Sequence, residues 1–299
     1  MDPLQTLFDA GLGEAVPLPE ALAQVYGEMR LPETTLTPSA SLRAGQHSPA
    51  AAAEGKRPWV IGNFVSSLDG VVALNIPGKL TGGGEIAGNA PHDRFIMGLL
   101  RALADVIVVG AGTLRSAPNH VWTADHVSKG FEEAHRELRQ RLGRQPNPLT
   151  VVVSNTGQMD LDKQPFRDPL APILIVATDK AADVLRDKAV SEWVSVREVS
   201  AGNLINARTI LDEIASIEPA ELILTEGGPR LMADFMNERC LDELFLTLSP
   251  QVVGREPSIH RPGFADGRAF APDNPIWGNL VSLKKGGDHL FLRYRFPAE

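Results

Sequence analysis

The strongest constraint on the fold is a repeated alternation of short, apolar, β-branched runs with stretches of helical spacing. ADVIVVG (104–110), LTVVVSNTG (149–157) and PILIVAT (172–178) have the length and composition of buried strands. Apolar residues recur at helical spacing in between, as in residues 95–103 and 205–217. This alternation predicts an α/β fold with a mostly parallel central sheet covered by helices on both faces.

The two ends of the chain depart from this pattern. NLVSLKKGGDHLFLRYRF (279–296) predicts a hairpin that bends at residues 286–288, and therefore antiparallel strands at the C-terminus. Residues 1–55 hold one amphipathic stretch, 19–29, followed by a segment rich in Pro, Ser, Ala and Gly that is typical of a linker. We expect an N-terminal extension over residues 1–55 and one domain over residues 56–299.

Composition excludes several classes of function. The 299 residues are 43% hydrophobic, but no run reaches the roughly 20 apolar residues of a membrane span. The net charge of −8 gives no basic footprint for nucleic acid. The single cysteine, Cys240, allows neither an internal disulfide nor a cysteine-rich zinc site, and with an N-terminus that lacks a signal-peptide pattern it predicts a cytoplasmic protein. His135 begins an H-x-E sequence without the P-C-x-x-C that a zinc deaminase needs, so we expect no metal.

Four predicted strand ends carry residues that favour a ligand, because ligands of open α/β sheets lie beyond the carboxyl ends of the strands. The four are SSLDG (66–70), GAGT (110–113), SNTG (154–157) and TEGGP (225–229). Glycine removes the Cβ between backbone and ligand, and the free N–H groups at a helix start favour phosphate. Two glycine turns, each directly after an apolar strand, indicate a nucleotide site.

The spacing of these glycines does not match the usual dinucleotide fingerprint. GAGTLR (110–115) lacks the last glycine, and TGGGEIAG (81–88) is one residue too long and follows no strand. The sequence has no G-x-S-x-G elbow and no Walker loop. Asp69 and Glu226 lie in the turns and are candidates for proton transfer, although Asp69 is equally well explained as a turn-forming residue.

Five motifs in this order resemble the RibD C-terminal reductase family, especially its stand-alone actinobacterial pyrimidine reductases. The likeness spans roughly residues 57–296. It implies a dihydrofolate-reductase-like, three-layer α/β fold, a homodimer and no metal. It also implies the NADPH-dependent reduction of the ribosylamino side chain of a phosphorylated pyrimidine in riboflavin biosynthesis. The motifs are NFVSSLDG (63–70), HDRFIMGLLRALADVIVVGAGTLR (92–115), VVVSNTG (151–157), LILTEGGPRLM (222–232) and LDELFLTLSPQVVG (241–254).

The resemblance also implies roles for individual residues. Asp69 or Glu226 would be catalytic, by assisting opening of the ribosylamine or delivering a proton. Many relatives have Arg where this chain has Asn155, which weakens the preference for NADPH over NADH because Arg binds phosphate in a bidentate way. The substrate would be bound by Asn63, Ser67, Asp93 and Arg94, with Arg94 a candidate for its phosphate. The cofactor would be bound by Gly110, Gly112, Thr113, Ser154, Asn155, Gly227, Gly228, Pro229, Arg230 and Leu231.

Two segments on the substrate side depart from the family pattern. SAPNHVW (116–122) stands where relatives often carry an acidic or tyrosine-containing loop, and KLTGGGEIAGNAP (79–91) is enlarged and rich in glycine. Two alternatives therefore remain open. One is a reductase of dihydrofolate or of another pterin-like or imine substrate, and the other is a nucleotide-binding relative that has lost catalysis.

Overall fold

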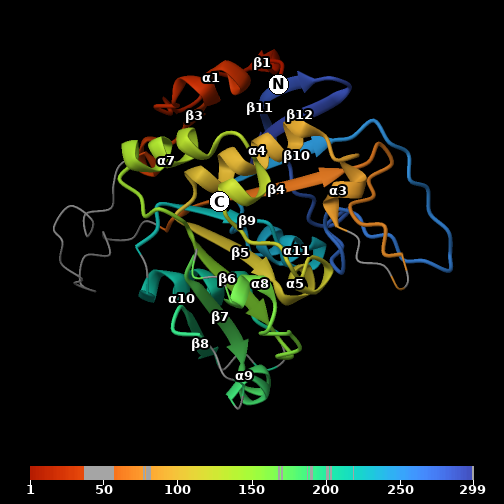
Figure 1. Ribbon diagram of the computed structural model, residues 1–299. Helices are drawn as coiled ribbons and strands as arrows, with labels where there is room; N and C mark the ends of the chain where they lie inside the picture. The colour runs from red at the N-terminus through yellow and green to blue at the C-terminus, as the bar shows by residue number, and fades with distance from the viewer. Residues whose placement is uncertain are drawn as a thin grey trace.

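The computed structural model describes residues 1–36, 57–76, 78, 82–167, 169, 171–186, 188, 191–199, 202, 204–217 and 219–297. In this part of the chain a ten-stranded sheet runs through the molecule in the order β1-β11-β12-β10-β4-β9-β5-β6-β7-β8 (Figure 1). A separate small sheet pairs β2 with β3. The strands are β1 Gln5–Asp9, β2 Glu14–Ala15, β3 Arg30–Leu31, β4 Trp59–Ser66, β5 Val106–Gly110, β6 Leu149–Ser154, β7 Ile173–Thr178, β8 Val194–Val199, β9 Leu222–Thr225, β10 Glu243–Leu248, β11 Asn279–Gly286 and β12 His289–Arg295.

Most of the large sheet is parallel, as the sequence predicts. The strands from β10 to β8, in the order β10-β4-β9-β5-β6-β7-β8, pair in parallel with one another. β12 pairs antiparallel with both β10 and β11, which confirms the predicted C-terminal hairpin. The carboxyl ends of β4, β5, β6 and β9 therefore point to the same edge of the sheet, where the sequence places its candidate residues.

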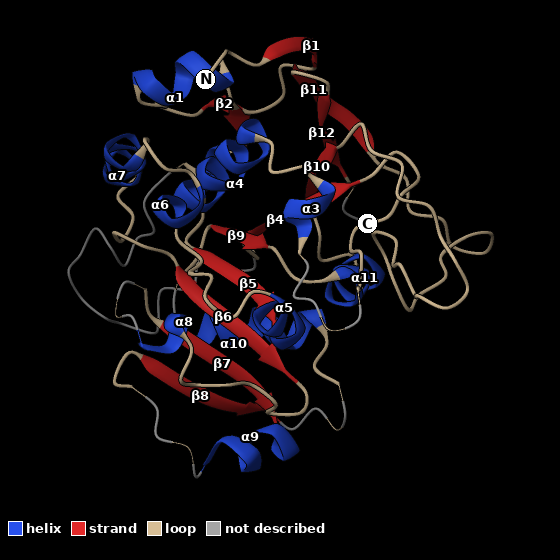
Figure 2. Ribbon diagram, turned by 45° about the vertical axis from the view of Figure 1, so that its right-hand side comes forward, coloured by secondary structure: helices blue, strands red, loops and turns tan. Residues whose placement is uncertain are grey.

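The sheet separates two apolar cores, because successive side chains of a strand point to opposite faces. In β5, Val106 and Val108 belong to one core, whereas Ile107 and Val109 belong to the other. Helices lie on both faces of the sheet and complete three layers (Figure 2). The helices are α1 Glu20–Tyr26, η1 Glu33–Thr35, α3 Gly83–Ile86, α4 Pro91–Leu103, α5 Ala111–Ser116, α6 Ala124–Val127, α7 Glu132–Arg141, α8 Gln164–Arg167, α9 Asp179–Arg186, α10 Ala207–Ile217 and α11 Pro229–Asn237.

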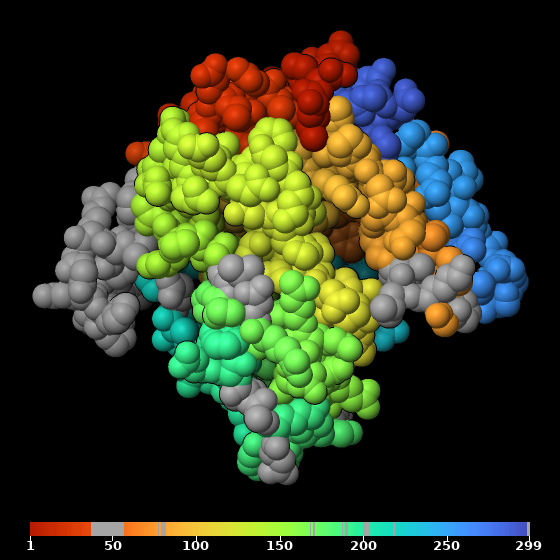
Figure 3. Space-filling model, in the orientation of Figure 1, coloured from red at the N-terminus to blue at the C-terminus, as the bar shows by residue number. Residues whose placement is uncertain are grey.

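The N-terminal segment is part of this architecture. β1 adds to the edge of the large sheet by pairing antiparallel with β11. Leu22, Tyr26 and Leu31 are buried in the core that α4 also lines. The guanidinium of Arg141 in α7 donates hydrogen bonds of 3.1 Å to two backbone carbonyls of the segment. Figure 3 shows the segment, in red, packed against the orange and yellow-green atoms below it.

The domain start expected at residue 56 therefore does not match the core, which already includes residues from position 4 onward. The expected helix within residues 19–29 is present as α1, although it is shorter than the amphipathic stretch. The expected linker, residues 37–56, lies outside the described residues. Among the residues that the structure describes, no helix is long and apolar enough to cross a membrane.

Candidate functional site

Two glycine turns meet at the carboxyl edge of the sheet. β5 and β9 are neighbours, and the backbone N–H of Glu226 continues their ladder by donating to the carbonyl of Val108 over 3.0 Å. A helix follows each strand: α5 begins directly after Gly110, and α11 begins after residues 226–228. A Cβ built on Gly228 would lie 3.8 Å from Oγ1 of Thr113, so the two predicted turns form one surface.

The glycines of this surface serve different purposes. A Cβ at Gly227 would come within 2.4 Å of Cδ2 of Leu231, so this glycine lets α11 pack against its own first turn. At Gly228 and Gly110 a Cβ would meet nothing closer than 3.8 Å and 4.0 Å, and neither residue has a positive φ. These two glycines leave open space next to the first N–H groups of two helices, an arrangement that suits the phosphates of a dinucleotide.

A buried ion pair borders the glycine turns. Glu226 follows β9, and its carboxylate accepts hydrogen bonds of 3.0 Å from Nε and 2.7 Å from Nη2 of Arg101 in α4. The exposed fractions of the two side chains are only 8% and 2%. Asn63 in β4 donates from Nδ2 to the same carboxylate over 3.4 Å. Glu226 is thus fixed in position by a strand on one side and a helix on the other.

The Arg101 guanidinium also holds the segment that precedes α6. Nη1 donates to the carbonyls of Val121 and Thr123 over 3.4 and 3.2 Å. Nη2 lies 2.8 Å from Nε2 of His120. Burial, followed by the charge of Arg101, lowers the pKa of His120 to about 2, so this imidazole is neutral at physiological pH.

Asp93 lies in the first turn of α4, and its side chain is buried. Burial raises its pKa to about 6, although a hydrogen bond with Thr247 and the charge of His289 act in the opposite direction. The charge of Glu226 contributes to the rise, which shows that the two carboxyl groups are close enough to interact. A carboxyl group with this pKa can exchange protons near neutral pH.

Asp69 does not fit the expected role of a proton donor. Its carboxylate accepts hydrogen bonds from the hydroxyl of Ser67 at 2.7 Å and from the backbone N–H groups of Val253 and Gly254 at 3.1 and 2.8 Å. These bonds, led by that of Ser67, hold its pKa at about 2. Ser67 also accepts from the N–H of Val71, which closes the turn after β4. The bonds from Val253 and Gly254 to Asp69 attach this turn to the loop that follows β10.

The predicted turn after β6 uses its polar groups within the protein. The Ser154 hydroxyl accepts from the N–H of Gly157 over 3.0 Å, and its side chain is buried. Oδ1 of Asn155 accepts from the N–H of Ile205 over 3.1 Å. Both residues lie at the expected edge of the sheet, but their oxygens stabilise the local fold. Neither supplies a positive charge for a phosphate group.

The two predicted arginines are accessible. Arg230 is in the first turn of α11, its side chain is 84% exposed, and its Nε lies 3.6 Å from a carboxylate oxygen of Asp266. Arg94 in α4 is exposed and donates to Oδ1 of Asn89 over 3.1 Å. Both remain available to an anionic ligand. No cluster of side chains suited to a metal ion occurs among the described residues.

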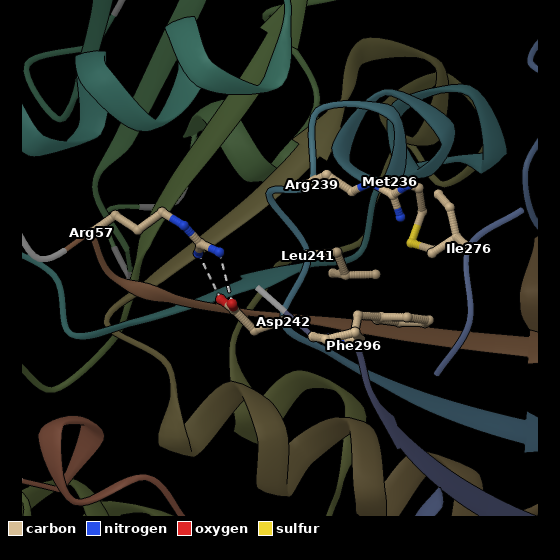
Figure 4. A pocket seen from close by; sticks show the side chains of 8 residues that line it. Arg57, Met236, Arg239, Leu241, Asp242, Ile276 and Phe296 are labelled. Atoms are coloured by element: carbon tan, nitrogen blue, oxygen red, sulfur yellow. Dashed lines mark hydrogen bonds and ion pairs between the residues drawn. The ribbon is translucent and has the colours of Figure 1, made fainter. Parts of the chain in front are cut away.

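A shallow pocket lies at the opposite edge of the sheet (Figure 4). Its residues precede β4 and β10, as Arg57 and Asp242 do, or surround the C-terminal end of α11. Arg57 and Asp242 form a bidentate pair with two hydrogen bonds of 2.7 Å, and Asp242 also accepts from the N–H of Val60. The carboxylate is fully engaged in fixing the strand start, so this pocket is structural.

Sequence reasoning missed Arg101 and His120. Arg101 stands in the apolar stretch LLRALAD, and an arginine that interrupts a buried helix face is the signal that could have identified it. His120 was contained in the divergent segment 116–122, but a single histidine in a loop gives no indication of its partner. Its importance follows from the position of Arg101, which only the tertiary structure reveals.

Comparison with known proteins places this arrangement in a family. The model of the RibD C-terminal domain matches residues 58–271. The chain therefore belongs to the RibD C-terminal domain family, a family of pyrimidine reductases.

Its relatives include named riboflavin enzymes. A 2,5-diamino-6-ribosylamino-4(3H)-pyrimidinone 5′-phosphate reductase of Archaeoglobus fulgidus is 28% identical over 72% of this chain and 89% of its own. The riboflavin biosynthesis protein RibD of Aquifex aeolicus is 21% identical over 68% of this chain and 49% of its own. Among solved structures, a pyrimidine reductase-like protein of Corynebacterium diphtheriae superposes with a TM-score of 0.61 at 22% identity, over 81% of this chain and 93% of that chain. That structural likeness supports the fold.

Proposed function

We propose that this protein is an NADPH-dependent reductase that reduces the ribosylamino side chain of a phosphorylated pyrimidine in riboflavin biosynthesis. The observation that carries the proposal is the junction of two glycine turns with the buried Glu226–Arg101 pair at one edge of the sheet. The proposal is supported by the relative that acts on 2,5-diamino-6-ribosylamino-4(3H)-pyrimidinone 5′-phosphate.

The glycine turns fit the phosphates of a dinucleotide. Gly110 and Gly228 leave open space at the start of α5 and α11, and Thr113 borders that space. We assign the pyrophosphate to the N–H groups around these residues, with Arg230 free to approach it. Bound there, NADPH supplies the hydride. Because Asn155 has no positive charge to pair with a 2′-phosphate, we expect only a weak preference for NADPH over NADH.

The side chains of the site have two tasks in this reaction. Glu226 is fixed by Arg101 and Asn63, so it can orient the substrate through hydrogen bonds without moving. Asp93 can deliver the proton that the side-chain nitrogen needs when the adjacent carbon is reduced, because its pKa lies near 6. Arg94 is exposed at the start of the same helix and is our candidate for the substrate phosphate.

The proposal is tested by measuring NADPH oxidation with the ribosylamino pyrimidine as substrate, together with NADPH affinity. Gly228→Ala should fold, because the new Cβ has space. It should raise the Kd for NADPH at least tenfold, because the methyl group fills the open space beside the first N–H groups of α11. Gly82→Ala is the matched control, since a Cβ there meets nothing within 4 Å, and it should leave the Kd unchanged. Unchanged affinity in Gly228→Ala would remove the cofactor from this surface.

A second candidate function is favoured by the divergent segment 116–122, which brings His120 to the Arg101–Glu226 pair. We propose as the alternative that the same site reduces dihydrofolate or another pterin-like imine. Steady-state assays with both substrates separate the two, because only one should show a high kcat/KM. NADPH binding without reduction of either would instead indicate a relative that has lost catalysis.

We also propose, from the family resemblance, that the protein is a cytoplasmic homodimer. Sedimentation velocity at micromolar concentration tests the assembly directly. A single species of 32.2 kDa would contradict it.

A further inference from the structure

The segment between α5 and α6 ends in residues 120–123, which we call the arch and which contact Arg101 of the buried ion pair. Val121, Trp122 and Thr123 are buried, with exposed fractions between 3 and 5%. Arg101 fixes the arch through the carbonyls of Val121 and Thr123. His120 precedes these anchors, and its ring is held edge to face against Trp122 and His126, with centroids 5.0 and 4.6 Å away. The imidazole therefore has a fixed orientation.

The contact with Arg101 determines which ring nitrogen of His120 carries the hydrogen. A guanidinium group has five N–H donors and no acceptor. Nε2 of His120 lies 2.8 Å from Nη2 of Arg101, so Nε2 must accept and cannot hold a proton. The hydrogen of the neutral ring is then on Nδ1. No hydrogen bond to Nδ1 is found among the described residues, and Nδ1 is not one of the fully buried polar atoms that lack a partner, so it is open to a ligand.

The charges around His120 favour an uncharged acceptor. Nη2 of Arg101 binds both His120 and Glu226, so the imidazole lies next to the glutamate carboxylate. The positive charge of Arg101 is balanced by Glu226, and the carboxyl group of Asp93 lies close enough to Glu226 to interact with it. A phosphate would meet no net positive charge here, whereas a neutral carbonyl oxygen can accept from Nδ1 without such a penalty.

We propose that His120 determines substrate specificity by donating a hydrogen bond from Nδ1 to a carbonyl oxygen of the substrate heterocycle, beside Glu226. This inference rests on the proposed function, since it names which part of the substrate lies at the arch.

The test compares two substitutions, each of which keeps the hydrogen-bonding role of one ring nitrogen of His120 and removes that of the other. In His120→Gln, the side-chain oxygen can still accept from Arg101, but no donor remains at the position of Nδ1. In His120→Asn, an amide can donate near Nδ1 without reaching Arg101. Glu137→Gln is the control, because it changes an exposed side chain of α7 that does not contact His120 or Arg101.

With 2,5-diamino-6-ribosylamino-4(3H)-pyrimidinone 5′-phosphate, we expect His120→Gln to raise KM at least tenfold while kcat changes less than threefold. His120→Asn should recover part of the loss, and Glu137→Gln should match the wild type. The Kd for NADPH and the melting temperature should stay unchanged in all three, which excludes a general loss of structure.

Each other outcome overturns a distinct statement. A wild-type KM in His120→Gln would overturn the role of His120, even if the enzyme reduces the pyrimidine as proposed. Calorimetry of the same pyrimidine in the presence of NADP⁺ is run in parallel. If the wild type neither binds nor reduces the compound, the proposed function fails, and this assignment of His120 fails with it.

Discussion

Arg101 is the residue that connects the parts of the site, because its buried guanidinium binds a strand end and a loop at once. Burying a charge is unfavourable unless it is paired and hydrogen bonded, and Glu226 provides most of that compensation. The pair is therefore expected to contribute to stability as well as to the geometry of the reaction.

Glu226→Gln should lower the free energy of unfolding by about 3 kcal/mol, because it leaves the charge of Arg101 buried and unpaired. It should also reduce kcat at least a hundredfold while NADPH binding persists. Urea denaturation and steady-state kinetics measure the two effects. Glu137→Gln breaks an exposed pair with Arg141 and should cost less than about 1 kcal/mol. An equal cost in both variants would contradict this view of the buried pair.

Asp93 should make stability depend on pH in an unusual direction. Its pKa is raised to about 6 in the folded protein from 3.8, so the folded state binds the proton more tightly than the unfolded state. The resulting penalty is absent below pH 4 and grows as the pH rises to 6, to on the order of 2–3 kcal/mol. Asp93→Asn should remove it.

Urea denaturation of wild type and Asp93→Asn at pH 4, 5, 6 and 7 measures this effect. The stability of the variant relative to the wild type should increase between pH 4 and 6 and then stay constant. If the difference in stability between the variant and the wild type does not depend on pH, the pKa of Asp93 is not raised in the folded protein. Asp69 has a lowered pKa, so its contribution is lost only as the pH falls below 4 toward 2.

The contrast between Asp69 and Asp93 shows what single residues reveal in a sequence. Both positions are recognisable as candidates because each follows or begins a predicted element. Their roles depend on burial and on partners that are distant in sequence, such as Val253 for Asp69 and Thr247 for Asp93. The sequence therefore located both carboxyl groups but could not distinguish the one that anchors a turn from the one whose pKa is raised by burial.

At the scale of elements, the strands with continuous apolar runs were predicted and β1 was missed. β6 and β7 are buried along nearly their whole length, and their composition reflects this. All five residues of β1 are exposed, so QTLFD shows neither an apolar run nor an alternating pattern. Its strand conformation depends on pairing with β11, which lies more than 270 residues further along the chain.

The N-terminal segment should be required for stability. Leu22→Ala removes a fully buried side chain from α1 and should lower the free energy of unfolding by about 2–5 kcal/mol. Leu7→Ala in β1 is the matched control, because that side chain is 48% exposed and the change should cost less than about 1 kcal/mol. Denaturant unfolding measures both. If Leu22→Ala is as stable as the wild type, the N-terminal segment does not contribute to the core, and a domain that begins near residue 56 is supported.

At the scale of the whole molecule, cofactor binding should stabilise the entire fold. The glycine turns follow β5 and β9, which lie inside the sheet and contribute to both apolar cores. NADPH at one hundred times its Kd should therefore raise the free energy of unfolding by about 2.7 kcal/mol. Thermal denaturation with and without NADPH measures the gain, and adenosine, which lacks phosphates, should give none. Destabilisation by NADPH would contradict binding to the native sheet.

The position of β9 has a consequence for how the protein matures. β9 lies between β4 and β5, although it follows them by more than 110 residues in the chain. Until residues 222–225 are inserted, β4 and β5 share no neighbour, and the two glycine turns cannot meet. A growing polypeptide can thus complete the proposed nucleotide site only after β9 has been synthesised and has docked between β4 and β5.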